Sequence, residues 1–334
     1  MTMGTAQMRE LAETARQWVS EGREAFLARP VTEQGFGPRE PAGAMLVDPR
    51  GECVGSLYRG VFDAELVAEA GAMAPGASAR LCEVSVRRAE AEGAGLTCGG
   101  GAEVLLQPLA AVPVEWWDLL GQGAGVALVT RLDEAAVYAE SVVVRAADRP
   151  GTDAERRAAE LLATRRAGRD ALYGESGLVL IEAYPSAPHV VICGGGELAE
   201  VIARQVRLLG WEAVTASGAG AARKALVEYR EAACLVVLTH EPEFDVPTLR
   251  TGLELGVPYV GALGSRKTTA RRREGLLAAG VGEAELARVH GPIGLDLGAR
   301  TPAETALAIC AEILGVLGGR DGGAMRDTTG PLNP

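Results

Sequence analysis

The chain has 334 residues, and its 44 acidic and 33 basic side chains give a formal net charge of −11. This length predicts about two domains. The negative charge, without a separated basic stretch, argues against nonspecific binding to nucleic acid, because a phosphate polymer would be repelled.

The first 28 residues carry charges throughout an amphipathic pattern and lack the apolar core of a signal peptide. No stretch of about eighteen uninterrupted apolar residues follows that could form a membrane helix. We therefore expect a soluble, cytoplasmic protein without membrane partners. The six cysteines form no Cys-x-x-Cys pair, and four of them lie in apolar runs typical of buried side chains, namely Cys82, Cys193, Cys234 and Cys310.

The N-terminal part, residues 1–150, is expected to form an α+β domain. It begins with an amphipathic helix over about residues 6–28, with Leu11, Trp18 and Phe26 on its core face. Short β segments then lie between glycines and prolines, and a helix over residues 63–72 interrupts them. The predicted strands are 25–31, 44–48, 53–58, 79–86, 102–109, 126–132 and 141–146.

Two glycine-rich stretches of this domain, Gly55–Gly60 and Gly95–Gly101, allow a ligand to approach the backbone. The second places Cys98 beside Gly99 and Gly100. A thiol among many backbone amides is a candidate low-pKa nucleophile or soft-metal ligand, with these glycines as cofactor-binding residues. The alternative is a glycine-rich turn with an incidental cysteine.

Residues 151–187 predict a charged helical linker and a crossing strand, ending at a boundary marked by Pro185 and Pro188. From 188 to 318, strands and helices alternate at a spacing that predicts a parallel, doubly wound, Rossmann-like sheet, followed by a flexible tail over 319–334. Ligands of such sheets bind beyond the carboxyl ends of the strands.

The first of these strands runs into a Gly-x-Gly-x-x-Ala turn formed by Gly194, Gly196 and Ala199. Such glycines permit a tight turn and close approach of a pyrophosphate, to which the following helix points its amide groups, so Gly195 is a candidate as well. An ordinary tight turn between strand and helix is the alternative.

Other polar residues follow later strands of the same sheet. His240 and Glu241 come after the third strand and are candidates for acid–base chemistry. Gly264, Ser265 and Arg266 follow the fourth strand, and an arginine at a helix start suits an anion. The neighbouring basic run is expected to be a solvated helix face, namely Arg271, Arg272 and Arg273.

The end of the second strand lacks the acidic residue that holds the ribose hydroxyls in NAD sites, because it carries Thr215, Ala216 and Ser217. NAD is therefore disfavoured. Ser217 with Arg223 or Lys224 could suit the 2′-phosphate of NADP, although these cations also fit an ordinary helix surface.

The last informative segment is a glycine- and proline-rich loop that holds His290 and Asp296. A histidine and a carboxylate beside the ligand edge of the sheet are candidates for acid–base or metal chemistry. Thr301 and Glu304 predict the cap of a helix that extends to about Leu317.

Residues 260–281 and 290–314 closely resemble the C-terminal Rossmann domain of the XdhC/CoxI family, and residues 37–56 and 95–109 resemble its N-terminal domain. The resemblance covers about residues 10–318. It implies an accessory protein of molybdenum enzymes such as xanthine dehydrogenase. Such a protein binds molybdenum cofactor (molybdopterin), promotes exchange of an oxo for a sulfido ligand with a cysteine desulfurase, and transfers the cofactor to the apoenzyme.

If this chain has the role that the resemblance implies, the pterin phosphate would rest on its Gly194–Gly196 turn or on Arg266, and the thiol of Cys98 would face the molybdenum. The family's run after the first Gly-Ser usually ends in cysteine followed one residue later by glutamate, whereas this chain has Val61 and Asp63, so a thiolate ligand is lost. Tyr58 and Arg59 replace glycines of this run. After the Rossmann turn the family often has histidine, and this chain has Glu197.

A second hypothesis is a divergent oxidoreductase that uses NAD(P) on a small molecule, with Tyr58, Arg59, Cys98, His240 and Glu241 as pocket and proton-transfer residues. A third is an interaction role without either ligand. The residues name neither the client enzyme nor the substrate, and a homodimer is the default expectation.

Overall fold

The structure is a computed structural model that describes residues 5–36, 43–165, 167–174 and 177–327. The chain divides into two compact units between Ser186 and Ala187. The end of the expected tail, residues 328–334, lies outside the described residues. The described part of the expected tail, residues 319–327, contains a 3-10 turn over Met325–Asp327.

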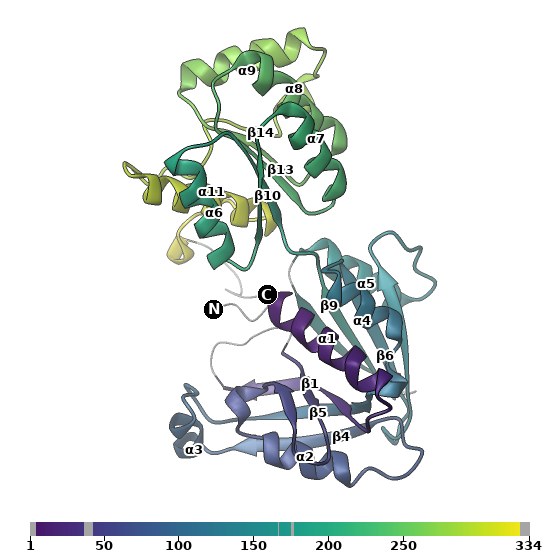
Figure 1. Ribbon diagram of the computed structural model, residues 1–334. Coiled ribbons are helices and arrows are strands. Elements are labelled where there is room, and N and C mark those ends of the chain that lie inside the picture. Colours follow the sequence, from purple (N-terminus) through teal and green to yellow (C-terminus); the bar gives the residue numbers. More distant parts are fainter. Residues whose placement is uncertain (1–4, 37–42, 166, 175–176, 328–334) are drawn as a thin grey trace. The chain divides into compact units, whose positions relative to one another are not determined.

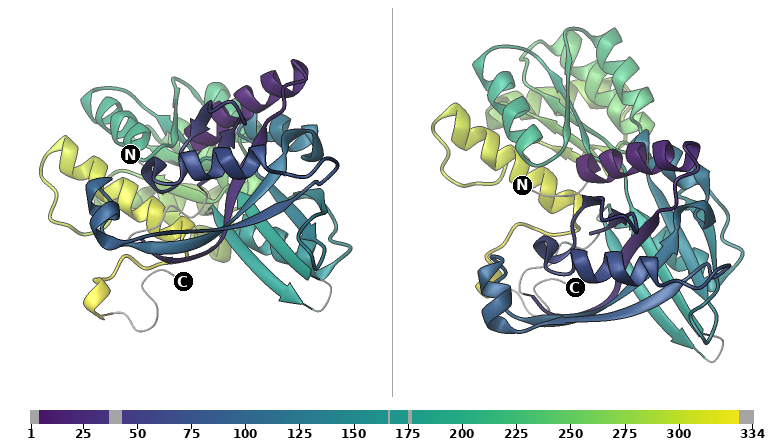
Figure 2. Two further views of the ribbon diagram at one scale, coloured as in Figure 1. Left: turned by 90° about the horizontal axis from the view of Figure 1, so that it is seen from below. Right: turned by 60° about the horizontal axis from the view of Figure 1, so that its bottom comes forward.

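The N-terminal unit contains an antiparallel five-stranded sheet with the order β3-β2-β1-β5-β4. Helix α2 (Asp63–Gly71) lies across one face of it (Figures 1 and 2), where Leu66 packs among buried side chains of the strands. The strands are β1 (Phe26–Gly35), β2 (Met45–Val47), β3 (Cys53–Gly55), β4 (Arg80–Val86) and β5 (Gly100–Pro108).

Helix α1 (Thr5–Ser20) packs on the opposite face through Leu11 and Trp18, in a core that includes Trp116. The helix predicted to reach residue 28 is shorter because Gly22 adopts a left-handed φ of 65° and the chain then enters β1. Phe26 accordingly lies on a strand, in the core beneath α2, so the predicted strand 25–31 is confirmed and the overlapping prediction that Phe26 belongs to a helix is wrong.

A four-stranded antiparallel sheet, with the order β7-β6-β9-β8, completes this unit. The segment 151–187, expected as a linker and a crossing strand, supplies one helix and two strands to it. The elements that follow β5 are α4 (Val114–Gly121), β6 (Val126–Leu132), β7 (Ala139–Arg145), α5 (Asp153–Ala163), β8 (Gly168–Gly174) and β9 (Gly177–Tyr184).

A buried ion pair connects the two sheets. Arg29 of β1 donates to the Glu182 carboxylate of β9 over 2.6 Å, and both side chains are almost completely buried. Arg169 of β8 donates to the other oxygen of Glu182. Because a buried charge without a partner is costly, these side chains hold the two sheets in one arrangement.

The C-terminal unit is a parallel sheet with the order β11-β10-β12-β13-β14. Helices α6 and α11 cover one face, and α7, α8 and α9 cover the other (Figure 1). The strands are β10 (His189–Cys193), β11 (Glu212–Ala216), β12 (Ala233–Val237), β13 (Tyr259–Ala262) and β14 (Val289–His290). The helices are α6 (Glu197–Leu208), α7 (Ala219–Glu228), α8 (Pro242–Leu255), α9 (Arg266–Ala278), α10 (Glu283–Leu286) and α11 (Pro302–Leu317).

This unit confirms the predicted Rossmann-like architecture. The strands are buried on both faces, as is typical of parallel sheets. The four cysteines expected to be buried are so, at exposures of 6% or less: Cys82, Cys193, Cys234 and Cys310.

Candidate functional site

The glycine turn joins the end of β10 to the start of α6. Gly194 has a φ of 119°, and a Cβ there would lie 3.1 Å from Leu238 Cβ and 3.3 Å from Thr239 Cγ2. Glycine is therefore required where this turn passes the residues that follow strand β12. A Cβ on Gly195 or Gly196 would meet nothing within 4 Å, and Gly196 is the N-cap of α6. The start of this helix is open to a ligand.

A pocket of about 450 Å³ extends from this turn along the flank of α6 toward β11, and we call it the α6 groove. Its wall contains the predicted Ala199 and, from β11, the exposed hydroxyl residue Thr215. The lining residues are Gly194, Gly195, Gly196, Ala199, Glu200, Ala203, Arg204, Arg207 and Thr215.

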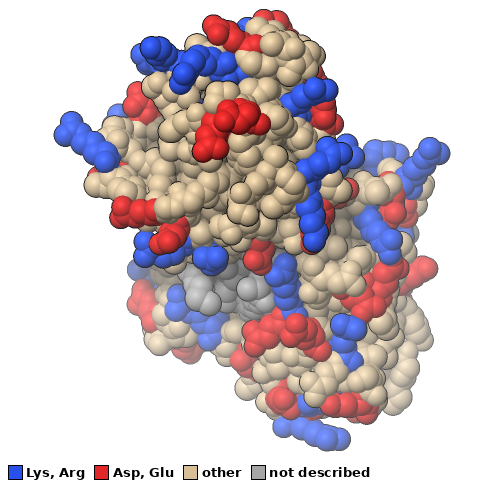
Figure 3. All heavy atoms as spheres, turned by 45° about the horizontal axis from the view of Figure 1, so that its top comes forward, with Lys and Arg blue, Asp and Glu red and all other residues tan. Residues whose placement is uncertain are grey.

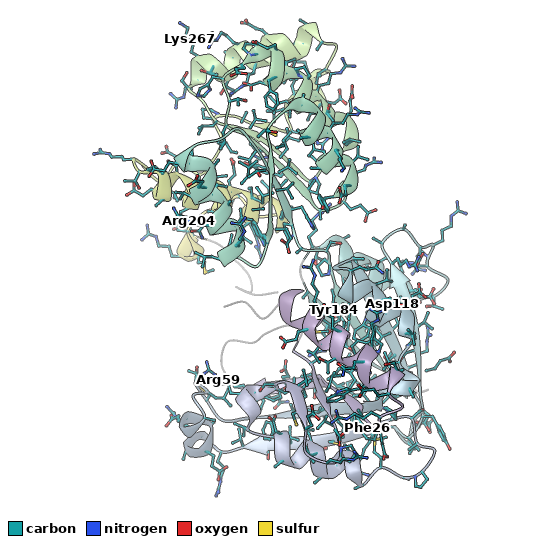
Figure 4. The ribbon with its side chains drawn as sticks, in the orientation of Figure 1. Phe26, Arg59, Asp118, Tyr184, Arg204 and Lys267 are labelled. Atoms are coloured by element: carbon teal, nitrogen blue, oxygen red, sulfur yellow. The ribbon has the colours of Figure 1, made fainter. Side chains whose placement is uncertain are left out.

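Two arginines of this groove, Arg204 and Arg207, were missed by the sequence interpretation. Both are exposed, and neither forms a hydrogen bond or ion pair with the described residues. Figure 4 shows Arg204 on α6, well separated from Lys267 at the start of α9. The signal that could have found them is their spacing of four and seven residues from Glu200, which places all three side chains on one side of the helix.

The ends of β12 and β13 are joined by Arg272 of α9. Its guanidinium donates to the carbonyl oxygen of Leu263 over 2.6 Å and to that of Thr239, and its Nε donates to Asp245 Oδ2 over 2.8 Å. Arg272 is only 5% exposed, so the prediction that it belongs to a solvated face is wrong. Its side chain instead satisfies carbonyl groups that the strand ends leave unpaired.

The other predicted residues at these strand ends are exposed. His240 Nδ1 lies 3.5 Å from an Arg272 nitrogen, and Glu241 is the residue before α8. Ser265 caps α9 by accepting a hydrogen bond from Thr268 N over 3.2 Å. Arg266 follows it on the exposed first turn of the helix.

Gly264 precedes this cap with a φ of 156°, and a Cβ there would lie 3.0 Å from an Arg272 nitrogen. Glycine at this position therefore leaves room for the buried guanidinium. Packing against Arg272 therefore explains why position 264 is glycine, without reference to a ligand.

His290 lies in β14 and belongs to a cluster that the sequence interpretation did not foresee. Its ring stacks on Tyr259 with 4.7 Å between the centroids, and its Nδ1 lies 3.3 Å from Glu312 Oε1. Glu312 also accepts hydrogen bonds from the Tyr259 hydroxyl and from Gly294 N. Burial favours the neutral carboxyl, but these hydrogen bonds outweigh it and hold the pKa of Glu312 below its ordinary value.

Asp296 is exposed in the loop after β14, and no hydrogen bond joins it to His290 among the described residues. The structure therefore pairs His290 with Glu312 rather than with Asp296. The predicted cap of α11 is confirmed, because Thr301 Oγ1 accepts from Glu304 N and the Glu304 carboxylate accepts from Thr301 N.

In the N-terminal unit, Cys98 is exposed in the loop between α3 (Arg88–Gly93) and β5. The glycines after it are tightly packed, since a Cβ on Gly99 would lie 2.7 Å from Val86 O and one on Gly100 would lie 2.4 Å from Gln34 O. These two glycines allow β5 to enter between its neighbouring strands.

The two glycine-rich stretches of this unit lie side by side. A Cβ on Gly95 would be 3.2 Å from an Arg59 guanidinium nitrogen. Tyr58 and Arg59 keep left-handed φ values of 50° and 56°, in a conformation that glycine adopts without strain. Arg59 is labelled in Figure 4. Nearby, Asp63 Oδ1 is buried without a hydrogen-bond partner among the described residues, and burial raises the pKa of this carboxyl.

No group of three or more His, Cys, Asp or Glu side chains is placed to hold a metal ion within residues 5–36, 43–165, 167–174 and 177–327. Across the same residues, none of the helices is both long enough and apolar enough to traverse a bilayer. On the face drawn in Figure 3, basic and acidic side chains are interspersed.

Comparison with known proteins agrees with this geometry. Residues 190–313 match the XdhC Rossmann domain, and residues 18–85 match the XdhC and CoxI family. The protein named "Uncharacterized protein YqeB" from Escherichia coli (strain K12) is 29% identical over 190 residues, which are 50% of this chain and 35% of YqeB. The matched region thus spans little more than a third of that relative.

A crystal structure described as a xanthine dehydrogenase from Bacillus halodurans superimposes with a TM-score of 0.62 at 19% sequence identity. The match covers 96% of this chain and 98% of that one. At this identity the likeness shows the shared fold alone.

Proposed function

Because the chain belongs to the XdhC and CoxI family, we propose that it binds molybdenum cofactor and supports its sulfuration and its insertion into an enzyme of the xanthine dehydrogenase type. The observation that carries this proposal is the α6 groove. It opens at the glycine turn of the Rossmann-like unit and carries two arginines without partners among the described residues.

The donor set of the groove fits the phosphate end of the cofactor. Guanidinium groups and backbone amides are the groups with which proteins bind phosphate. Either Arg204 with Arg207 or the backbone of Gly195 and Gly196 would hold the phosphate, and the small side chain of Ala203 leaves room for the cargo along the helix flank.

The residues fit a thiolate-bound molybdenum less well. Val61 is a partly buried member of the core beneath α2 and offers no ligand atom. Of the cysteines in this unit, Cys98 is exposed, Cys53 is partly exposed and Cys82 is buried. We therefore assign this chain a role in holding and transferring the cargo, and assign the sulfur chemistry to a cysteine desulfurase partner.

The proposal is tested by purifying the full chain from a host that makes molybdopterin and oxidising the bound material to a fluorescent pterin. We expect about one pterin per binding site, as for a family member that retains the first-domain cysteine. Absence of pterin from this chain, with pterin present in that control, would contradict the proposal.

One observation favours a second candidate, an NAD(P)-dependent oxidoreductase. Thr215 lies in the wall of the groove, near the strand end where an NAD site has an acidic residue, and the nearby arginines suit a 2′-phosphate. This candidate predicts binding of NADPH in preference to NADH. It fails if neither binds at millimolar concentration.

A further inference from the structure

The α6 groove has carboxylates at one end and guanidinium groups at the other. Glu197 and Glu200 belong to the first turn of α6, and Glu200 lines the groove. Arg204 and Arg207 follow in later turns, about 12 and about 16 Å beyond Gly196 along the axis at about 1.5 Å per residue. The charge therefore changes sign along the groove.

Both arginines are available to a ligand. Glu200 and Arg204 have the i,i+4 spacing that favours an ion pair, but no ion pair joins them among the described residues. The groove wall between these charges is formed by Ala199 and Ala203, whose small side chains are buried. This leaves space for a ligand to lie along the helix flank.

The start of α6 is a weaker anion site than the glycine turn alone suggests. A helix N-terminus carries the equivalent of about half a positive charge. The carboxylates of Glu197 and Glu200 add two negative charges to that turn. A phosphate at the glycine turn would be repelled by this excess of negative charge. A phosphate near Arg204 and Arg207 would instead contact two guanidinium groups.

We propose that the α6 groove binds a phosphate ester with its phosphate against Arg204 and Arg207 and its hydroxyl or amine donors toward Glu200. This inference rests on the proposed function only in taking a phosphate-bearing ligand. It differs from the placement expected from the sequence, in which the phosphate rests on the Gly194–Gly196 turn or on Arg266.

The test uses the full chain at low ionic strength, with AMP and adenosine as probes that differ only in the phosphate. Calorimetric titration is expected to show AMP binding at least ten-fold more tightly than adenosine. In the variant Arg204→Ala/Arg207→Ala the ratio of the affinity for AMP to that for adenosine should fall to about one. The matched control Arg250→Ala/Arg271→Ala removes the same charge from the same unit outside the groove and should keep the wild-type ratio.

Glu197→Ala tests the orientation, because Glu197 is adjacent to the glycine turn and lies about 10 Å from Arg204 along the helix axis. If the phosphate lies at the arginines, this variant should leave the ratio of the AMP and adenosine affinities nearly unchanged. If AMP instead binds several-fold more tightly while Arg204→Ala/Arg207→Ala has no effect, the phosphate lies at the glycine turn and the inference is overturned. Equal affinities of the wild type for AMP and adenosine would also overturn it.

Failure of this inference is distinguishable from failure of the proposed function. Pterin recovered from the wild type, together with an unchanged AMP ratio in Arg204→Ala/Arg207→Ala, would reject the orientation and keep the cofactor role. Loss of the AMP ratio in that variant, with no pterin in the wild type, would keep the phosphate site and reject the cofactor.

Discussion

Arg272 of α9 and Asp245 of α8 form a buried ion pair, with 2.8 Å between Arg272 Nε and Asp245 Oδ2, and side-chain exposures of 6% and 1%. The same guanidinium donates to the carbonyl groups that end β12 and β13. The pair thus fixes the edge of the sheet from which His240 and Ser265 project.

Removing this guanidinium is expected to destabilise the C-terminal unit. Arg272→Ala leaves Asp245 buried without its counter-charge, which costs about 3–5 kcal/mol. The neighbouring Arg271 is exposed, so Arg271→Ala should change the free energy of unfolding by about 0.5 kcal/mol or less. Urea unfolding measures both variants, and equal stability of the two would show that the buried pair contributes nothing.

The buried charges of the N-terminal unit predict an order of effects. Glu182→Leu removes the carboxylate that serves both Arg29 and Arg169, whereas Arg29→Met leaves Glu182 paired with Arg169. We therefore expect Glu182→Leu to reduce the free energy of unfolding more than Arg29→Met does. The opposite order in urea unfolding would contradict this assignment of the network.

Glu312 predicts a pH dependence. Its pKa lies below its ordinary value of 4.5 in the folded protein, so its contribution to stability is present above about pH 4.5 and is lost as the pH falls through the folded pKa. Glu312→Gln should be less stable than the wild type at pH 6, and the difference should shrink toward pH 3. Thermal unfolding across this range tests the prediction, with the exposed Glu274→Gln as a control that should show no such trend.

The glycine turn offers a matched pair of substitutions. Gly194→Ala places a methyl group 3.1 Å from Leu238 Cβ at a φ of 119°, and should destabilise the unit by about 1–3 kcal/mol. Gly195→Ala meets open space and should change stability by about 0.5 kcal/mol or less. Similar unfolding midpoints for the two variants would show that the close approach at Gly194 is tolerated.

The parallel sheet was predictable because its strands are continuous apolar runs separated by helices, and the glycine turn because its spacing is local. Strand β14 was not predictable, because a strand of only two residues, Val289 and His290, is too short to show a hydrophobic pattern. Arg272 and Glu312 were missed for a different reason. Their partners lie 27 and 22 residues away in sequence, and only the packing of helices on the sheet brings them together.

The central claim is tested most directly by measuring molybdopterin on the purified full chain and on its groove variants, as oxidised pterin per protein. The account predicts that the wild type and Arg250→Ala/Arg271→Ala carry pterin and that Arg204→Ala/Arg207→Ala, folded to the same extent, loses at least nine-tenths of it. Wild-type protein without pterin, prepared beside a pterin-loaded family member, would contradict the claim.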